Sequence, residues 1–166
     1  MTVEELAATA IGACESLGVD YMIAGAFAVS AYGIPRSTKD VDLVIDLAGG
    51  DPIKAVMEKL QGLVEFDEQI QFDTLTWGKR QVGTARKGPP LKLELFELFD
   101  DPFVIEQFRR KQEAFSELLG RATRLPTAED VIVQKLRWGR SKDLDDARDV
   151  PAVQEPEKLD MAYIRQ

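Results

Sequence analysis

The chain has 166 residues, a length that favours one domain, and its 45% hydrophobic and 30% charged residues are typical of a globular protein. It contains no histidine and one cysteine, Cys14, which excludes Ser-His-Asp and Cys-His catalysis, His-ligated zinc and an intrachain disulfide. The net charge of −8 argues against tight, non-specific nucleic-acid binding, because a polyanion is repelled over a long range.

Targeting signals are missing from the sequence pattern. No apolar run approaches the roughly 18 residues of a membrane span. The first 20 residues are acidic and amphipathic, whereas a signal peptide opens with positive charge and an unbroken apolar core. Together with the single cysteine, this predicts a cytoplasmic protein with no membrane partner.

Cap signals and apolar periodicity predict the elements in chain order. Thr2 and Glu5 form a capping-box pattern, and apolar residues at helical spacing follow it to Gly18, which indicates a first helix. Apolar runs and turn residues further along predict strands at 19–25, 41–47, 69–77, 80–86 and 91–99, and helices at 26–32, 51–60, 101–120 and from 127 onward. We expect a linker-like run at 150–160 before a last short helix. This order predicts an α+β fold with a mixed sheet.

Two acids stand at the head of the strand expected at 41–47. Because residues two apart in a strand point to the same face, Asp40 and Asp42 emerge together, while the apolar residues between and after them face the other way. Two such charges repel unless water or a cation intervenes. Paired carboxylates are typical ligands of Mg²⁺ in phosphoryl transfer. A lone Asp-x-Asp also arises by chance in acidic surface loops, so the pair needs support from other residues.

A third acid is expected from the strand at 91–99. Alternation there puts Glu94 in mid-strand, where a charge is costly without a partner. Glu97 lies near the strand end and can simply reach water, so we favour Glu94 as the third ligand. Gly25 adds a turn after a strand and before a helix whose N-terminus is suited to phosphate oxygens.

These residues resemble the signature of the nucleotidyltransferase (DNA polymerase β-like) superfamily, closest to small bacterial AbiEii-type proteins. The resemblance runs from about Tyr21 to Val150. Its motifs are Gly25-Ala26, "YGIPRSTKDVDLVI" from Tyr32 to Ile45, Leu93-Glu94-Leu95-Phe96, and a later set formed by Pro126, Glu129, Asp130, Lys135, Leu136, Lys142, Asp143 and Asp146.

The resemblance implies a mixed sheet flanked by helices, with a nucleotidyltransferase core at 1–125 and a C-terminal helical extension at 126–166 packed on it. It implies transfer of a nucleoside monophosphate from a nucleoside triphosphate to an acceptor, with Mg²⁺ or Mn²⁺ as cofactor. The acceptor is open between a protein, a small molecule such as an antibiotic, and an RNA end, and a toxin–antitoxin role is implied as one possibility. The implied catalytic and metal-binding residues are Asp40, Asp42 and Glu94, and the implied nucleotide-binding residues are Gly25, Ala26, Arg36, Lys39 and Lys135.

Two departures from the family pattern keep an inactive nucleotide- or protein-binding relative as the alternative. Ala26 stands where a glycine or serine is usual, and Glu94 where an aspartate is usual. An Asp-x-Asp glycosyltransferase is a third reading, although those enzymes usually have a larger nucleotide-binding domain.

Several of the charged and aromatic candidates have a structural reading beside the functional one. Arg36 and Lys39 either meet phosphate or neutralise Asp40 at the surface. Lys135 lies in the apolar sector of its helix and either points into a cleft or extends out to solvent. Asp143 and Asp146 have a structural reading as a helix cap and as partners of Arg140 or Arg148, and this reading is favoured for Asp146. Tryptophans 77 and 138 either stack on a base or pack in the core or at its rim.

Overall fold

The computed structural model describes residues 1–74 and 78–166. The helices are α1 (Val3–Ser16), α2 (Gly25–Tyr32), α3 (Pro52–Leu60), α4 (Pro102–Arg110), α5 (Ala128–Trp138), α6 (Ser141–Val153), the 3-10 turn η1 (Pro156–Lys158) and α7 (Met161–Ile164). The strands are β1 (Tyr21–Ile23), β2 (Asp40–Ile45), β3 (Val64–Phe66), β4 (Gln71–Asp73), β5 (Gly78–Ala85), β6 (Lys92–Glu97), β7 (Gln112–Ser116) and β8 (Arg121–Leu125).

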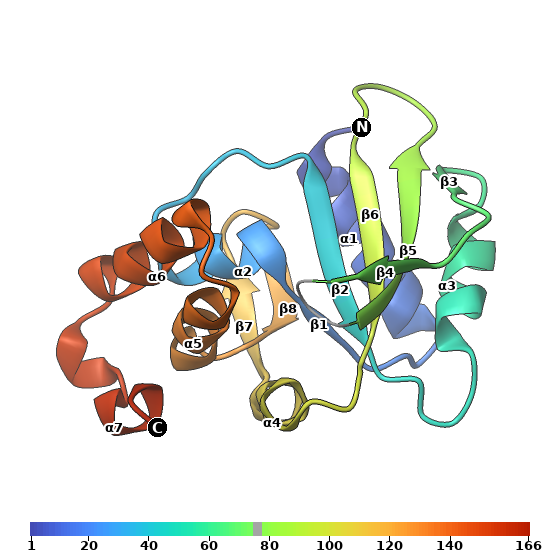
Figure 1. Cartoon of the computed structure of the whole chain (residues 1–166). Helices are drawn as coiled ribbons and strands as arrows, with labels where there is room; N and C mark the ends of the chain where they lie inside the picture. The colour runs from blue at the N-terminus through green and yellow to red at the C-terminus, as the bar shows by residue number, and fades with distance from the viewer. Residues whose placement is uncertain (75–77) are drawn as a thin grey trace.

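The main sheet is mixed. Its strand order is β1-β2-β6-β5-β3, with β4 paired to β5 beside this path. Strands β2 and β6 are parallel, and the other pairs are antiparallel. In Figure 1, α1 and α3 lie behind the sheet, and α2, α5 and α6 gather beside its β1–β2 side. The predicted α+β class with a mixed, helix-flanked sheet is therefore confirmed.

The two parallel strands at the centre each have one apolar face. Val41, Leu43 and Ile45 of β2 are completely buried, as are Leu93 and Leu95 of β6, and all belong to the core that α1 covers. The alternate residues point to the opposite face, where the acids stand. Burial of these apolar side chains fixes the register of both strands, because a slip of one residue would turn the apolar set toward solvent.

Helix α1 follows its sequence signals closely. The Glu5 amide donates to the Thr2 hydroxyl at 3.2 Å, and the Thr2 amide donates to Glu5 Oε2 at 2.7 Å, so the predicted capping box is formed. Cys14 is completely buried on the apolar face, as a small hydrophobe. Burial raises the pKa of its thiol to about 12, with a smaller contribution from the negative charge of Glu15.

The helix predicted at 101–120 is wrong in its second half. Helix α4 ends at Arg110, and Lys111 takes an extended conformation that leads into the hairpin β7–β8. Gly120, expected to close the helix, lies in the hairpin turn with a φ of 62°. The apolar spacing was misleading because Phe115 is 67% exposed, whereas Thr123 and Leu125 of β8 are buried. Contacts between β8 and β1 decide this conformation, and such contacts leave no local sequence signal.

Other boundaries also differ from the predictions. The run at 150–160 is not a linker throughout, because α6 continues through Pro151 to Val153. Strand β3 was not predicted, and the hairpin expected around Gly78 has that glycine as the first residue of β5. Trp77 lies outside the described residues.

The C-terminal helices pack on one another and on α2. Helix α5 contacts α6 and α7, and α6 contacts α2. Helix α7 is tied to α5 by the Tyr163 hydroxyl, which donates to the completely buried Asp130 carboxylate at 2.6 Å. The predicted division at 125/126 falls between β8 and α5, and it stays a prediction. Within the described ranges, no helix combines the length and the hydropathy needed to cross a membrane.

Candidate active site on the acidic face of the sheet

The turn from β1 into α2 brings its backbone against an acid of β2. Gly25 has a φ of 60°, and a side chain there would place its Cβ 1.8 Å from Asp42 Oδ2. The Ala24 amide donates to the Asp42 carbonyl at 2.8 Å, which holds the turn to the strand. The N-cap residue of α2 is Ala24, whose methyl group cannot cap the helix. Gly25 is therefore required both by the backbone conformation and by the space that the Asp42 carboxylate occupies.

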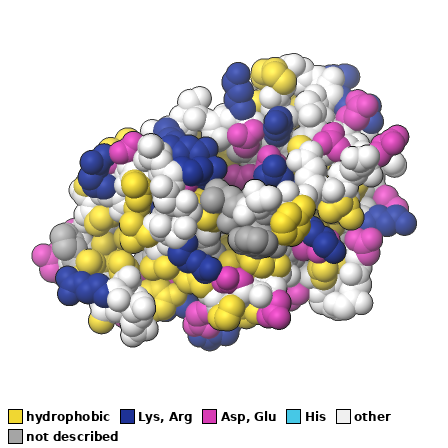
Figure 2. All heavy atoms as spheres, viewed as in Figure 1, with side chains coloured by type: hydrophobic (Ala, Val, Ile, Leu, Met, Phe, Trp, Pro, Cys, Tyr) yellow, Lys and Arg dark blue, Asp and Glu magenta, His cyan; other side chains and the backbone are white. Residues whose placement is uncertain are grey.

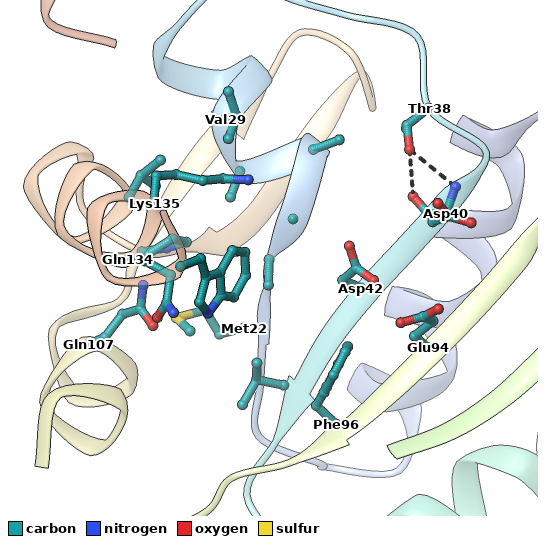
Figure 3. A pocket seen from close by; sticks show the side chains of 18 of the residues that line it. Met22, Val29, Thr38, Asp40, Asp42, Glu94, Phe96, Gln107, Gln134 and Lys135 are labelled. Carbon is teal, nitrogen blue, oxygen red and sulfur yellow. Dashed lines mark hydrogen bonds between the residues drawn. The ribbon is translucent and has the colours of Figure 1, made fainter. Parts of the chain in front are cut away.

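The acids of β2 and β6 are neighbours across the parallel pair. Asp42 stands opposite Glu94 in the register, and adjacent strands lie about 4.8 Å apart. Asp40 lies two residues before Asp42 on the same face, and its backbone is tied to the Thr38 hydroxyl (Figure 3). The expectation that these three side chains come from one face of the sheet agrees with this register.

The carboxyl group of Asp42 is strongly affected by its surroundings. Burial, then the negative charge of Glu94 and then that of Asp40 raise the pKa of Asp42 to about 7, against smaller opposing effects of Lys135 and Arg80. Burial is the largest of these causes, and the two neighbouring acids act in the same direction.

Glu94 has a basic partner on its other side. Arg80 Nη1 of β5 donates to Glu94 Oε2 at 2.8 Å, and both side chains are largely buried, with exposed fractions of 24% and 14%. Sequence alternation puts Arg80 on one face of its strand, but only the strand pairing shows that this face is shared with Glu94.

The acidic face forms one wall of a pocket of about 550 Å³. Helix α5 supplies the opposite wall through Gln134 and Lys135 (Figure 3). Trp138 of the same helix also lines the pocket. In Figure 2, basic and acidic side chains gather around a hollow between the sheet and the part of the molecule that carries α5 and α6. The predicted residues Gly25, Ala26, Arg36, Lys39, Asp40, Asp42, Glu94 and Lys135 all line the pocket.

Lys135 is buried, with 4% exposure, and does not extend to solvent. Its Nζ lies 3.0 Å from Asp143 Oδ1 and 2.9 Å from Asp146 Oδ2, both on α6. The structural reading of Asp143 as a partner of Arg140 is correct, but Asp146 pairs with Lys135 and Arg36 instead of Arg140 or Arg148. The acids that follow α5 thus hold Lys135 at the pocket wall.

The two basic residues before β2 differ in their contacts. Arg36 Nη2 lies 2.7 Å from Asp146 Oδ2, so its partner is on α6 and is not Asp40. Lys39 is exposed at the rim of the pocket. Both positions allow contact with an anion in the pocket.

Some lining residues were not singled out by the sequence. Gln107, Gln134 and Arg80 come from three separate elements, and no motif joins them. Trp138 lines the pocket as well, with Lys135 Nζ 5.0 Å and the Arg140 guanidinium carbon 5.4 Å from its ring centre. The indole therefore lies at the pocket wall beside two basic side chains that also line the pocket.

The donor set fits a divalent cation that arrives with other ligands. Among the described residues, no group of three or more acidic or sulfur side chains is arranged to hold a metal by itself. Mg²⁺, however, usually binds through one or two carboxylates plus substrate phosphates and water. The Asp42 and Glu94 carboxyl groups, which are neighbours across the parallel strand pair, supply the oxygen donors that such a cation requires.

Solved structures described as nucleotidyltransferases share the fold of this chain. ANT(2'')-Ia in complex with adenylyl-2''-tobramycin matches with a TM-score of 0.67 and 17% identity over 99% of this chain and 98% of that chain. An antigenic nucleotidyltransferase-like protein from Paracoccidioides brasiliensis matches with a TM-score of 0.63 and 20% identity over 91% and 74% of the two chains.

The lincosamide antibiotic adenylyltransferase LnuA, bound to lincomycin, matches with a TM-score of 0.56 and 16% identity over 85% of this chain and 91% of that chain. No protein-family model matches the sequence, and no curated protein matches it. At these identities the comparisons show the fold, and the activity has to be argued from the site.

Proposed function

We propose that the protein is a Mg²⁺- or Mn²⁺-dependent nucleotidyltransferase that moves a nucleoside monophosphate from a nucleoside triphosphate to an acceptor. The observation that carries the proposal is the position of Asp42 opposite Glu94 in the register of two parallel strands. Both acids line the same pocket, and Asp42 lies directly against the Gly25 turn. Asp40, Asp42 and Glu94 are the proposed catalytic and metal-binding residues.

The residues around the acids support binding of a triphosphate. The uncapped N-terminus of α2 offers backbone amides at Gly25 and Ala26 to phosphate oxygens. Lys135 faces the acids from the other wall, and Arg36 and Lys39 supply positive charge at the rim. A bound cation would neutralise charge on the transferring phosphoryl group. In this proposal Glu94 accepts the proton of an acceptor hydroxyl.

The acceptor is proposed to be a small molecule that carries a hydroxyl group. Two of the structural neighbours are described with modified or bound antibiotics, tobramycin for ANT(2'')-Ia and lincomycin for LnuA. A protein or an RNA end is the alternative acceptor, and it goes with the AbiEii-type relationship and toxin–antitoxin role that the sequence resemblance implies. A cytoplasmic location belongs to the same proposal.

The test is transfer of label from each of the four α-³²P-labelled ribonucleoside triphosphates, with Mg²⁺, to tobramycin, lincomycin, and the protein and RNA fractions of a cell extract. We expect labelled product with one of these acceptors and pyrophosphate release. Asp42→Asn should lower the rate at least about 100-fold, because it removes a carboxylate proposed to hold the cation and, with the cation, electrostatic stabilisation of the transition state. Asp46→Asn is the matched control, since Asp46 directly follows β2 but is absent from the pocket lining, and it should leave the rate unchanged.

One observation favours the second candidate, a nucleotide-binding relative without catalysis. Glu94 is already held by Arg80 at 2.8 Å, and its side chain is longer than the aspartate of the family pattern. If the protein only binds nucleotide, a triphosphate would raise the melting temperature of the wild type and of Asp42→Asn alike. No pyrophosphate would be released from any triphosphate. That result would exclude the transferase.

A further inference from the structure

Glu94 stands between an acid and a base. On the β2 side its register partner is Asp42. On the β5 side its partner is Val82, and Arg80 lies two residues along β5, opposite Phe96. The Arg80 side chain crosses this diagonal to reach Glu94 Oε2 at 2.8 Å.

The position of Arg80 is well defined by its surroundings. Its guanidinium lies 5.6 Å from the centre of the Phe96 ring, and Nη2 lies 3.4 Å from Gln71 Oε1. Only 24% of the side chain is exposed, so the contact with Glu94 is screened less than a surface ion pair would be. Arg80 also lines the pocket, where a planar guanidinium is suited to bind phosphate oxygens.

Metal binding and phosphate binding both compete with the Arg80–Glu94 ion pair. A cation that binds Glu94 from the Asp42 side is repelled by the positive charge of Arg80. A phosphate group that binds Arg80 is repelled by the negative charge of Glu94. Each ligand therefore has to break the same ion pair before it makes its full set of contacts.

We propose that the Arg80–Glu94 ion pair couples metal binding to nucleotide binding by partner exchange. Without ligands, Arg80 neutralises Glu94 and weakens the hold of the site on a free divalent cation. When a triphosphate enters, Arg80 binds phosphate oxygens and Glu94 turns to the cation. This inference rests on the proposed function, because it takes the nucleoside triphosphate and the metal as the ligands of the pocket. Arg80 is then a phosphate-binding residue through which the metal and the nucleotide bind together.

The exchange predicts opposite effects for the two halves of the pair. Arg80→Met should tighten binding of the metal alone about tenfold, within the range of typical coupling between sites, and should weaken binding of nucleotide without metal. Glu94→Gln should weaken metal binding and tighten metal-free nucleotide binding, because it releases Arg80. If the effects pass through the ion pair, each should shrink to less than about twofold when the other partner is already replaced.

The experiment uses the full chain, stripped of metal, with Mn²⁺ as the probe and free Mn²⁺ measured by electron paramagnetic resonance. Nucleotide binding is measured by calorimetry with a nucleoside triphosphate in EDTA. The variants are Arg80→Met, Glu94→Gln and the double variant. Arg86→Met is the matched control, because Arg86 follows the same strand and pairs with the exposed Glu65, and it should change neither affinity.

Tenfold tighter Mn²⁺ binding in Arg80→Met, lost in the double variant, is the expected result. Equal Mn²⁺ affinity in the wild type and Arg80→Met, or a loss of both affinities in both single variants, would overturn the exchange. If Arg80→Met does not fold, tighter metal-free nucleotide binding by Glu94→Gln, compared with the wild type, decides the matter. Both experiments measure binding, so their results do not depend on catalysis. Absence of label transfer would contradict the proposed function and would not change the measured affinities.

Discussion

At the scale of single residues, Gly25 and Asp42 depend on each other most directly. The left-handed φ of 60° at Gly25 turns the chain from β1 into α2, and the missing side chain leaves the space in which Asp42 Oδ2 lies. The sequence suggested that this glycine serves a phosphate. The structure adds a nearer reason, which is that any Cβ at position 25 would displace the acid of β2.

Gly25→Ala should therefore destabilise the fold and disturb the site together. An alanine in the left-handed region costs about 1 kcal/mol or more, and the Cβ contact at 1.8 Å forces Asp42 or the turn to move. We expect a loss of about 2 kcal/mol or more in the free energy of unfolding, measured by urea denaturation, and loss of nucleotide transfer.

Gly12→Ala is the control for this substitution. Gly12 lies within α1, and a Cβ there meets nothing within 4 Å. Because alanine is the better helix former, this variant should gain up to about 1 kcal/mol. A Gly25→Ala variant as stable and as active as the wild type would show that the Asp42 carboxylate does not need this space.

Residue-level prediction from the sequence worked where a strict period applies. Alternation in β2 put Asp40 and Asp42 on one face, and alternation in β6 put Glu94 on the face opposite its leucines. It could not reveal the contact of Arg80 with Glu94. That contact depends on which strands pair and in which register, and strand order is not encoded in the spacing along the chain.

At the scale of elements, α4 and α5 are joined by one carboxylate. Asp101 caps α4 by accepting from the amides of Phe103 and Val104, and it receives two hydrogen bonds from Arg137 of α5 at 2.9 and 2.8 Å. The Arg137 hydrogen bond is the largest of the effects that lower the pKa of Asp101 to about 2.

This ion pair predicts a specific dependence of stability on pH. Since the folded pKa lies below the ordinary value of 3.8, the stabilisation is complete above about pH 4 and is lost as the pH falls toward 2. Solvent screens the pair, because 42% of the Arg137 side chain is exposed, so we expect a contribution of about 1 kcal/mol.

Asp101→Asn isolates this contribution, because asparagine keeps the capping oxygen but not the charge. Urea denaturation at pH 6, 4, 3 and 2 should show the wild type more stable at pH 6 and the difference vanishing toward pH 2. A difference that is constant across this range would contradict the lowered pKa, because it would mean that folding does not change the pKa of Asp101.

Helices α5 and α6 are joined by a buried charge cluster. Lys135 lies between Asp143 and Asp146, and all three side chains are buried. Lys135→Met should cost about 3–5 kcal/mol in the free energy of unfolding, because it leaves two buried acids with fewer counter-charges. Adding Asp146→Asn should restore part of this loss, although Asp146→Asn alone should be destabilising.

The double-mutant cycle is measured by urea denaturation. Additive losses in the four proteins would show that Lys135 and Asp146 do not stabilise each other. The result also bears on activity measurements, since a Lys135 variant that loses nucleotide transfer has to be shown to be folded before Lys135 is assigned a contact with phosphate.

The elements themselves were predictable where caps and period agree. The capping box of α1 and the Asp-Pro start of α4 both appear in the structure. The end of α4 was not predictable, because Phe115, Leu118 and Leu119 continue the apolar helical spacing, yet 112–116 pairs with 121–125 as a hairpin. Packing of Thr123 and Leu125 inside the molecule outweighs the local preference.

At the scale of the whole molecule, charge is distributed unevenly. The net charge is −8, yet arginines and lysines line the pocket together with its acids. Figure 2 shows both signs of charge scattered over the visible face. Long-range repulsion of polyanions is therefore expected to prevail outside the pocket.

We expect no measurable binding to random-sequence duplex DNA at physiological salt, with a Kd weaker than about 10⁻⁴ M. Fluorescence anisotropy with a labelled 30-base-pair duplex, at 50 and 150 mM salt, tests this expectation. Micromolar binding that weakens steeply with salt would contradict it, and would indicate a continuous basic surface.

The sequence by itself determined the residues of the acidic face, the glycine turn before it and the mixed class of the sheet. Those features follow from local rules, since side-chain alternation and backbone conformation act over a few neighbouring positions. Only the tertiary structure decided that Asp42 stands opposite Glu94 in the strand register. The same holds for the ion pair of Arg80 with Glu94 and for the position of Asp146 between Lys135 and Arg36. These contacts join residues from 11 to 110 positions apart, and packing of the whole chain brings them together because it buries the leucine and valine faces of the central strands.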